Sequence, residues 1–456
     1  MNLHTKLAAR AEAGRPVRVG LIGAGKFGAM FLNQVRRTCG LHLVGIADLS
    51  VDRARQRCGD TDWPAEQTAA ASFDEAAHNG STHITDDAHK LIESGLVDVL
   101  VEATGDPAAG IRHCLGAIEH RVHVVMVNVE ADVLAGPLLA DRARAAGVLY
   151  SLAWGDQPAL ICEHVDWARA CGFEVICAGK GTRYHPSFHQ STPDTVWDSF
   201  GFDAQEAERG GMNAKMFNSF IDGTKSAIEM TAVCNATGLR PQRGGLQFPP
   251  VSCWELANVC KPKGTGGVLE HAGTTEVVSS LNRDKTPIPN DLMFGTYVVI
   301  EAPNDYARRC FAEYKMLPDE SGHFAALFRP THMIGLELGI SIASVALRAE
   351  PTGAPTGFRS DVVAIAKRAL RAGETLDGEG GYCVWGRQVP AEVSLREGLL
   401  PIGLAHNVRA TNDIAEGRTL RWRDVVVDED SLAVRTRRQM EAATGDTQNG
   451  TNVGRD

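Results

Sequence analysis

Three glycines near the start of the chain have the spacing of a phosphate-binding turn. Gly23, Gly25 and Gly28 follow the apolar run 17–22, and helical spacing resumes at Ala29. The first glycine permits a tight turn, the second lets the backbone approach a pyrophosphate, and the third lets a helix pack closely against the strand. The N-terminus of that helix offers free N–H groups and a partial positive charge to phosphates. The pattern predicts a dinucleotide site that also includes Ala24, Lys26 and Phe27.

An acidic residue stands where such a site needs one. The second apolar run, 41–47, ends in Asp48, about 20 residues after the last glycine, which is the spacing of a ribose-binding acid. A carboxylate there can accept both ribose hydroxyls of NAD and would repel a 2′-phosphate. We therefore expect NAD or NADP as the cofactor, with NAD preferred. Arg53 and Arg55 follow closely enough to leave NADP open.

Small or polar residues follow three later apolar runs, each of which is predicted to be a strand. These are 97–102 with Ala103, Thr104 and Gly105, 122–127 with Asn128 and Glu130, and 149–153 with Asp156. The carboxyl ends of parallel strands face the ligand cleft, so we expect Ala103 to Gly105, together with Asn128 and Glu130, to line the nicotinamide end of the cofactor. The alternative is that these residues only cap loops and helices.

A lysine between two glycines could do proton chemistry. Lys180 lies between Gly179 and Gly181, directly after the predicted strand 174–178. The flanking glycines predict a turn with an exposed, mobile ammonium near a cleft. Such a group could anchor a substrate or protonate a developing alkoxide during hydride transfer. An ordinary turn lysine is the alternative.

Charged residues in two later segments could contact a substrate. A helix is predicted to open at Asp222 or two residues later, and it places Lys225 and Glu229 on one face. The alternative for this pair is a surface ion pair of little energetic weight. Arg329 and His332 precede another apolar helix and could bind an anionic substrate. The alternative for the arginine is a structural role.

The composition excludes several classes of protein. The net charge is −10 with no basic stripe, so no nucleic-acid partner is expected. No stretch reaches the length of a membrane span, and the first 15 residues carry scattered charges in place of the apolar core of a signal peptide. The 11 cysteines stand singly, which indicates a reducing cytoplasm and predicts neither a disulfide framework nor a metal site.

The second half of the chain contains a linker and a weak repeat. Residues 350–360 are rich in proline and glycine. Beyond them, Ala366, Leu370, Gly373, Thr375 and Leu376 recur as Ala410, Ile414, Gly417, Thr419 and Leu420. This repeat predicts two related β-rich units packed together. The expected parts are a dinucleotide-binding domain (1–155), a catalytic domain (156–350), a β-rich domain (351–441) and a disordered tail (442–456).

Several motifs along the chain carry a family resemblance. They are Val-Asn-Val-Glu-Ala-Asp-Val (127–133), Gly-Pro-Leu (136–138), Tyr-Ser-Leu (150–152), Gly-Asp-Gln-Pro (155–158), Ala-Gly-Lys-Gly (178–181), Phe-Ile-Asp-Gly-Thr-Lys (220–225) and Asn-Ala-Thr-Gly-Leu (235–239). Together they resemble the homoserine-dehydrogenase-like oxidoreductases with a C-terminal SAF domain, a family that includes the DXR-like reductoisomerases. The resemblance implies an α/β fold with a Rossmann domain, a central α/β catalytic domain that also forms a homodimer, and a β-rich SAF domain.

These observations predict an NAD(P)-dependent oxidoreductase. It would transfer hydride between nicotinamide and a small, polar, anionic hydroxy or carbonyl compound. Lys180 and Lys225 are expected to position the substrate oxygen and carry its proton, with Asp222 and Asp156 as charge partners. Arg329, His332 and Glu229 are expected to bind the substrate.

Two alternatives stay open. One is a DXR-like reductoisomerase that converts 1-deoxy-D-xylulose 5-phosphate with NADPH and a divalent metal. The other is a non-catalytic NAD-binding sensor or scaffold.

Overall fold

The computed structural model describes residues 2–201, 203 and 213–450, and it divides the chain into two compact units. Unit 1 comprises the chain as far as Leu160 together with Met333–Pro355. Unit 2 comprises Ile161–His332 and the chain from Thr356 onward.

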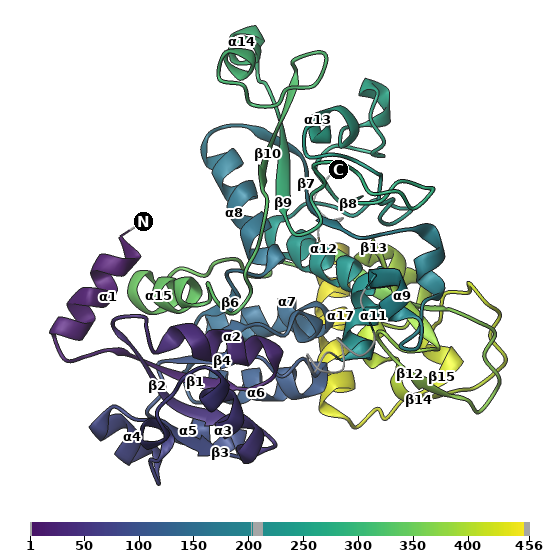
Figure 1. The fold of residues 1–456 in the computed structure, drawn as a ribbon. Coiled ribbons are helices and arrows are strands. Elements are labelled where there is room, and N and C mark those ends of the chain that lie inside the picture. Colours follow the sequence, from purple (N-terminus) through teal and green to yellow (C-terminus); the bar gives the residue numbers. More distant parts are fainter. Residues whose placement is uncertain (1, 202, 204–212, 451–456) are drawn as a thin grey trace. The chain divides into compact units, whose positions relative to one another are not determined.

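A six-stranded parallel sheet forms the centre of unit 1 (Figure 1). Its order is β3-β2-β1-β4-β5-β6. The strands are β1 (Val17–Ile22), β2 (Leu41–Ala47), β3 (His83–Thr85), β4 (Val99–Glu102), β5 (His123–Met126) and β6 (Tyr150–Leu152). The strand order reverses between β1 and β4, which makes this a doubly wound fold with its ligand crevice at the carboxyl ends of those strands. The predicted Rossmann fold is confirmed.

Helices surround this sheet, and one of them comes from much later in the chain. They are α1 (Leu3–Glu12), α2 (Lys26–Val35), α3 (Val51–Asp60), η1 (Ala65–Thr68), α4 (Phe73–Asn79), α5 (Ala88–Glu93), α6 (Pro107–Glu119), α7 (Val129–Ala145) and α15 (Gly339–Arg348). Ile342 and Val345 of α15 share a buried core with Val19 and Leu21 of β1. The structure therefore places residues 333–355 with unit 1, whereas the sequence assigned 333–350 to the central domain.

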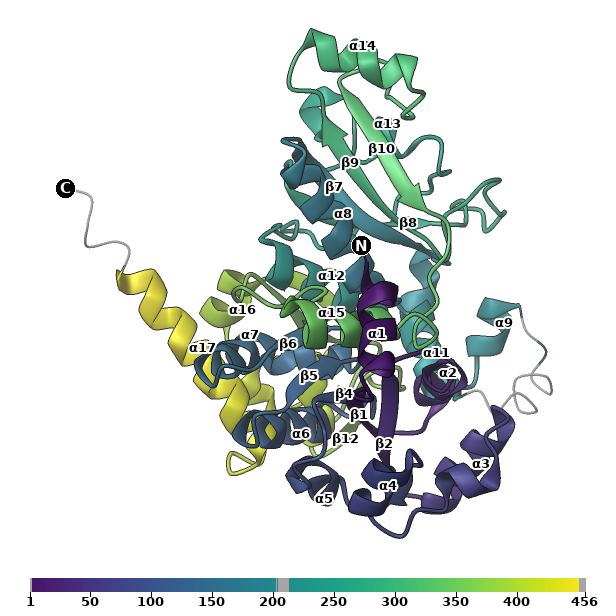
Figure 2. The same ribbon diagram turned by 90° about the vertical axis from the view of Figure 1, so that its left-hand side faces the viewer.

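Unit 2 contains a mixed sheet of order β10-β9-β7-β8 (Figure 2). Strand β7 is parallel to β8 and antiparallel to β9, which is antiparallel to β10. The strands are β7 (Glu174–Thr182), β8 (Thr274–Ser279), β9 (Thr296–Glu301) and β10 (Phe324–Arg329). The helical segments before and between them are α8 (Gln157–Ala170), which contains the unit boundary, η2 (Pro186–Gln190), α9 (Val196–Phe200), α11 (Ala214–Ile221), α12 (Thr224–Thr237), α13 (Leu256–Val259), η3 (Lys263–Thr265) and α14 (Asp305–Glu313).

The C-terminal part of unit 2 is rich in strands, as predicted. Its strands are β11 (Ser360–Ala366), β12 (Thr375–Asp377), β13 (Val384–Pro390), β14 (His406–Ala410) and β15 (Val425–Val426), and its helices are α16 (Ala391–Glu397), η4 (Ile402–Leu404), η5 (Trp422–Asp424) and α17 (Leu432–Gly450). The repeated residues pair with one another. Leu370 and Ile414 exchange both backbone hydrogen bonds at 2.9 Å. Gly373 N–H donates to the Ala410 carbonyl and Gly417 N–H to the Ala366 carbonyl, both at 2.8 Å. The two repeats therefore contact each other through equivalent positions.

The end of the chain differs from the expected disordered tail. Helix α17 continues to Gly450, and residues 451–456 lie outside the described residues. Arg437 anchors the helix, because it is fully buried and pairs with Asp361 of β11 at 2.5 Å. Once a helix is nucleated, each further residue adds at small cost, so an anchored helix can extend into a polar segment.

Candidate active site

The glycine turn of unit 1 has the tight geometry that its sequence predicts. Gly23 has a φ of +97°, and a Cβ there would lie 2.7 Å from the carbonyl oxygen of Ala103. A Cβ on Gly28 would lie 2.2 Å from the carbonyl oxygen of Gly23. A Cβ on Gly25 would meet no atom within 4 Å, so the turn is open on that side. Helix α2 begins directly afterwards, with Lys26 and Phe27 in its first turn.

Asp48 is hydrogen-bonded to the backbone of this turn. Its carboxylate is buried and accepts a hydrogen bond from Ala24 N–H at 2.8 Å through Oδ2. The other oxygen accepts from Ser50 N–H at 2.9 Å and pairs with the Arg53 guanidinium at 2.5 Å. The acid that we expect to favour NAD, directly after β2, is therefore in contact with a cation of α3 that could bind a 2′-phosphate.

Asn128 joins the ends of β4 and β5. Its side-chain amide donates to Thr104 Oγ1 at 3.2 Å and to the Asp106 carbonyl at 2.8 Å. Its side-chain oxygen accepts from Ala131 N–H at 3.1 Å and so caps α7. Glu130 lies in the first turn of this helix and is partly exposed. Asn128 thus does what the capping alternative predicted, and at the same time it holds the Thr104 loop in place.

Sequence reasoning missed the acid beneath this loop. Glu102, the last residue of β4, is fully buried and accepts a hydrogen bond from the Thr104 hydroxyl at 2.6 Å through Oε1. The same oxygen contacts His113 Nδ1 of α6 at 3.1 Å. Glu102 was hidden because it ends an apolar run and looked like an ordinary strand terminus.

Lys180 does not lie in a turn, contrary to the sequence prediction. It is inside β7, it is 5 % exposed, and its ammonium pairs with the Glu229 carboxylate of α12. The flanking glycines allow close packing here instead of mobility. A Cβ on Gly179 would lie 1.8 Å from the Glu276 carbonyl oxygen, and one on Gly181 would lie 1.8 Å from that of Leu292.

Lys180 belongs to a polar row across the sheet of unit 2. In the strand register, Lys180 of β7 is paired with Thr296 of β9, and Thr296 is paired with Arg329 of β10. Side chains of paired residues point to the same face of a sheet. Two positions further along β7 and β9, Ala178 and Val298 pack in the core beneath α8 and α12. Two cationic side chains therefore flank a threonine on the helix-covered face.

A histidine that the sequence analysis did not single out contacts this row. His164 of α8 lies 3.0 Å from the Thr296 hydroxyl through Nε2. Burial, and then the positive charge of Arg329, lower the pKa of His164 to about 4, so its imidazole is neutral near pH 7. A lone histidine on a helix gave no signal in the sequence. The predicted His332 contacts the Phe294 carbonyl at 2.7 Å through Nδ1.

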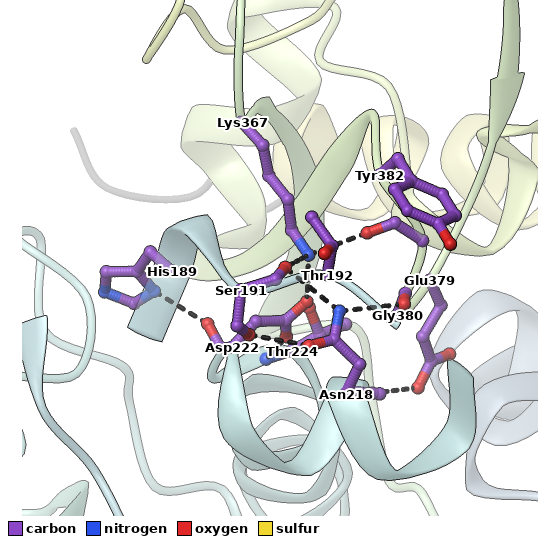
Figure 3. Close-up of polar contacts among 12 residues, drawn as sticks. His189, Ser191, Thr192, Asn218, Asp222, Thr224, Lys367, Glu379, Gly380 and Tyr382 are labelled. Atoms are coloured by element: carbon purple, nitrogen blue, oxygen red, sulfur yellow. Dashed lines mark hydrogen bonds and ion pairs between the residues drawn. The ribbon is translucent and has the colours of Figure 1, made fainter. Parts of the chain in front are cut away.

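Asp222 has a partner that the sequence did not suggest. Its buried carboxylate pairs with Lys367 at 2.8 Å through Oδ2 and accepts from Thr224 N–H at 2.9 Å through Oδ1 (Figure 3). Its carbonyl oxygen accepts a hydrogen bond from His189 Nδ1 at 2.7 Å. Lys180 pairs with Glu229 instead, so the structure does not make Asp222 the charge partner of Lys180.

The other two predicted catalytic residues, Lys225 and Asp156, belong to different units. Lys225 is in the first turn of α12 and is partly exposed. Asp156 belongs to unit 1, where its buried carboxylate accepts from Gln157 N–H at 2.9 Å. The structure thus brings Lys180, Glu229 and Arg329 to one face of the unit 2 sheet.

Two family models match this chain. Residues 19–152 match the NAD-binding domain of homoserine dehydrogenase, and residues 155–338 match the catalytic domain of oxidoreductase DRL. The chain therefore carries an NAD-binding domain of the homoserine dehydrogenase type and an oxidoreductase catalytic domain of the DRL type. It is an NAD(P)-dependent enzyme, and its glycine turn fits a dinucleotide, because side chains at Gly23 and Gly28 would fill the space that the close turn requires.

Solved structures similar to this oxidoreductase share little sequence with it. An NAD-binding oxidoreductase from Klebsiella pneumoniae is 18% identical over 37% of this chain and 43% of its own, with a TM-score of 0.28. A probable dehydrogenase from Thermotoga maritima is 11% identical over 74% of this chain and 90% of its own, with a TM-score of 0.37. A myo-inositol dehydrogenase from Lactobacillus casei is 14% identical over 40% of this chain and 50% of its own, with a TM-score of 0.29. No curated protein matches the sequence.

The described residues of the oxidoreductase lack two features. No helix among them is long and apolar enough to cross a membrane. Within the same part of the chain, no group of three or more His, Cys, Asp and Glu side chains is placed to hold a metal ion.

Proposed function

We propose that this oxidoreductase transfers hydride between a nicotinamide and a small, polar, anionic hydroxy or carbonyl compound. The observation that carries the proposal is the row of Lys180, Thr296 and Arg329 on one face of the unit 2 sheet. Arg329 offers a planar guanidinium to a carboxylate or phosphate, and Lys180 offers an ammonium to the reacting oxygen. His332, three residues after Arg329, is proposed to help bind the anion.

The cofactor residues are proposed from the turn in unit 1. The backbone from Gly23 to Gly28 would bind the pyrophosphate, and Asp48 would bind the adenine-side ribose of the preferred NAD. Residues Ala103 to Gly105, with Asn128 and Glu130, would line the nicotinamide end. A bound nicotinamide supplies or accepts the hydride.

The proton would move through the chain's own residues. In the reducing direction, the Lys180 ammonium donates a proton to the carbonyl oxygen as the alcohol forms, and in the oxidising direction the neutral amine takes it back. Glu229 holds the Lys180 amine in place and balances its charge. Lys225, four residues before Glu229 on the same helix face, would return the proton from solvent. Asp156 remains a proposed charged neighbour of the site.

The first experiment is a substrate screen with site variants. We expect NAD(P)H oxidation with some 2-oxo acids or phosphorylated carbonyl compounds, and none with uncharged aldehydes of the same chain length. Lys180→Met should lower kcat by about 10²- to 10⁴-fold, the usual contribution of a general acid, while NADH binding stays unchanged. Arg329→Met should mainly raise KM for the anionic compound.

A matched control separates chemistry from stability. Lys261 forms another buried ion pair in unit 2, with Asp319 at 2.7 Å. Lys261→Met should therefore cost stability without the loss in kcat. If Lys180→Met and Lys261→Met lower kcat equally, Lys180 has no role in the chemistry.

One observation favours a second candidate, the DXR-like reductoisomerase. The Arg53 guanidinium lies 2.5 Å from the Asp48 carboxylate, where it could bind the 2′-phosphate of NADPH. Metal-dependent consumption of 1-deoxy-D-xylulose 5-phosphate with NADPH would support this candidate over the first.

We also propose a cytoplasmic homodimer whose residues 351–441 form a SAF domain. The pairing of the two repeats supports the domain assignment. All 11 cysteines are free thiols, which supports a reducing compartment. Light scattering of the purified chain would test the dimer.

A further inference from the structure

The N-terminus of α12 is held by the strand-rich C-terminal part of unit 2. Lys367, which follows β11, is 2% exposed, and its ammonium makes three contacts (Figure 3). It pairs with Asp222 at 2.8 Å and donates to the carbonyls of Ser191 at 2.7 Å and Gly381 at 2.9 Å. Two of the three N–H donors of the ammonium are used by these carbonyls, and the Asp222 carboxylate balances its charge.

Two further hydrogen bonds connect the same elements. Gly386 N–H of β13 donates to the Thr224 hydroxyl at 2.8 Å, at the first residue of α12. The Asn218 side chain of α11 donates to the Gly380 carbonyl at 2.9 Å. Both hydrogen bonds are buried. The start of α12 is therefore held from the C-terminal part at two points, Asp222 and Thr224, and the preceding helix α11 is held at a third, Asn218.

The cap of α12 explains why Lys367 matters for the helix. Its N-cap is Gly223, at a φ of +92°, and this residue has no side chain to cap the first turn. The Asp222 carboxylate takes that place by accepting from Thr224 N–H. The position of this carboxylate in turn depends on its ion pair with Lys367.

Glu229 lies one and a half turns into the same helix and pairs with Lys180. A shift at the start of α12 would move the Glu229 carboxylate, and the Lys180 ammonium would follow or lose its partner. We propose that Lys367 is a positioning residue for the reaction, which acts through Asp222 and α12 on the Lys180–Glu229 pair. This inference rests on the proposed function of Lys180. It gives the C-terminal part a role in catalysis without any contact to the substrate.

The test compares three variants with the wild-type protein, and Glu229→Gln serves as the reference for a Lys180 that has lost the charge of its partner. Lys367→Met removes the ammonium. Thr224→Val removes the hydrogen bond from Gly386 N–H to α12 without leaving a buried charge unpaired. Lys261→Met is the matched control, because it breaks a buried lysine–aspartate pair in the same unit. Each protein is assayed for kcat and KM with the best compound of the screen, for NADH binding by fluorescence, and for the rate at which acetic anhydride acylates Lys180.

The acylation rate reports directly on the Lys180–Glu229 pair and needs no substrate. We expect Lys367→Met to raise the acylation rate in the same direction as Glu229→Gln, and Thr224→Val to raise it less. The kcat of Lys367→Met should fall by about 100-fold, because a displacement near 1 Å can cost that much. NADH binding should not change in any variant, and Lys261→Met should leave both the acylation rate and kcat near those of the wild type.

The outcomes separate the two proposals. If Lys367→Met does not fold, the inference is tested by Thr224→Val alone, and an acylation rate and kcat equal to the wild type would overturn it. If Lys367→Met folds but behaves like Lys261→Met, the positioning role is wrong while the role of Lys180 stands. If Lys180→Met keeps the wild-type kcat, the proposed function fails, and the acylation rates still decide whether Lys367 positions the pair.

Discussion

Asp48 is the residue that we expect to decide between NAD and NADP, and its neighbours act in opposite directions on that choice. The carboxylate repels a 2′-phosphate, but the Arg53 guanidinium that pairs with it would attract the same group. The sequence showed both residues and could not show that they touch. Because Asp48 also accepts from Ala24 N–H, removing its side chain would disturb the glycine turn. A useful variant must keep a side-chain oxygen that accepts this hydrogen bond but must lose the negative charge of the carboxylate.

Asp48→Asn meets that requirement. We expect the wild type to bind NADH more tightly than NADPH, and the variant to lose most of this preference. A hydrogen bond to a charged group contributes about 1.5–3 kcal/mol, so NADH affinity should fall by roughly 10- to 100-fold. Arg53→Ala should weaken NADPH binding more than NADH binding. Fluorescence titration gives both affinities, and Arg55→Ala, an exposed arginine paired with Asp52, is the control. A wild-type preference for NADPH would contradict our interpretation of Asp48.

At the scale of elements, a buried acid links α7 to β6. Asp132 of α7 is fully buried and accepts a hydrogen bond from the Tyr150 hydroxyl at 2.8 Å. Burial raises the pKa of Asp132 from 3.8 to about 7, partly offset by that hydrogen bond. The native state therefore holds this proton at pH values where the unfolded chain has lost it. The favourable contribution is complete below pH 4 and is lost as the pH rises through 7.

Asp132→Asn should remove this pH dependence. Three pKa units correspond to about 4 kcal/mol, so the wild type should lose up to this amount relative to the variant between pH 4 and pH 8. Urea unfolding at both pH values measures the difference in the free energy of unfolding. Asp141→Asn is the control, because Asp141 lies on the same helix but is exposed and pairs with Arg144. A constant difference between Asp132→Asn and the wild type across this pH range would show that Asp132 is ionised throughout.

The elements of unit 1 could be predicted from the sequence, and the reason is their strong local pattern. Five of the six strands, all but β3, lie within the predicted apolar runs, because a buried parallel strand is apolar on both faces. Strand β7 was predicted too short, since glycine usually ends a strand. Here Gly179 and Gly181 are needed for close approach to Glu276 and Leu292, and only the three-dimensional structure shows those neighbours.

The candidate site could be predicted only in part, because its residues come from distant segments. Lys180 and Glu229 were both selected from the sequence, but their pairing was not foreseen. His164 and Lys367 were missed, because a single histidine or lysine has no local pattern that marks it. Only the structure shows that His164 contacts Thr296 and that Lys367 pairs with Asp222.

At the scale of the whole molecule, the chain passes from one unit to the other three times. Unit 1 is completed by Met333–Pro355, which adds α15 to the core of β1. Local sequence patterns cannot show such a return, because the apolar face of α15 would suit any core. The proposed cofactor residues belong to unit 1, whereas Lys180, Glu229 and Arg329 belong to unit 2. Because of this division, we expect the cofactor to stabilise unit 1 more than unit 2.

We expect saturating NADH to slow amide hydrogen exchange in β1 to β6 and not in β7 to β10. A ligand that binds only the native state stabilises it by about 2.7 kcal/mol at 100 times its Kd, which is roughly a 100-fold slowing of exchange through unfolding of the unit that binds it. Mass spectrometry of the full-length protein with and without NADH would measure this effect peptide by peptide. Peptides of α15 should gain the same protection as β1, since they share one core. Equal protection of β7 to β10 would contradict this expectation and would show that both units unfold together.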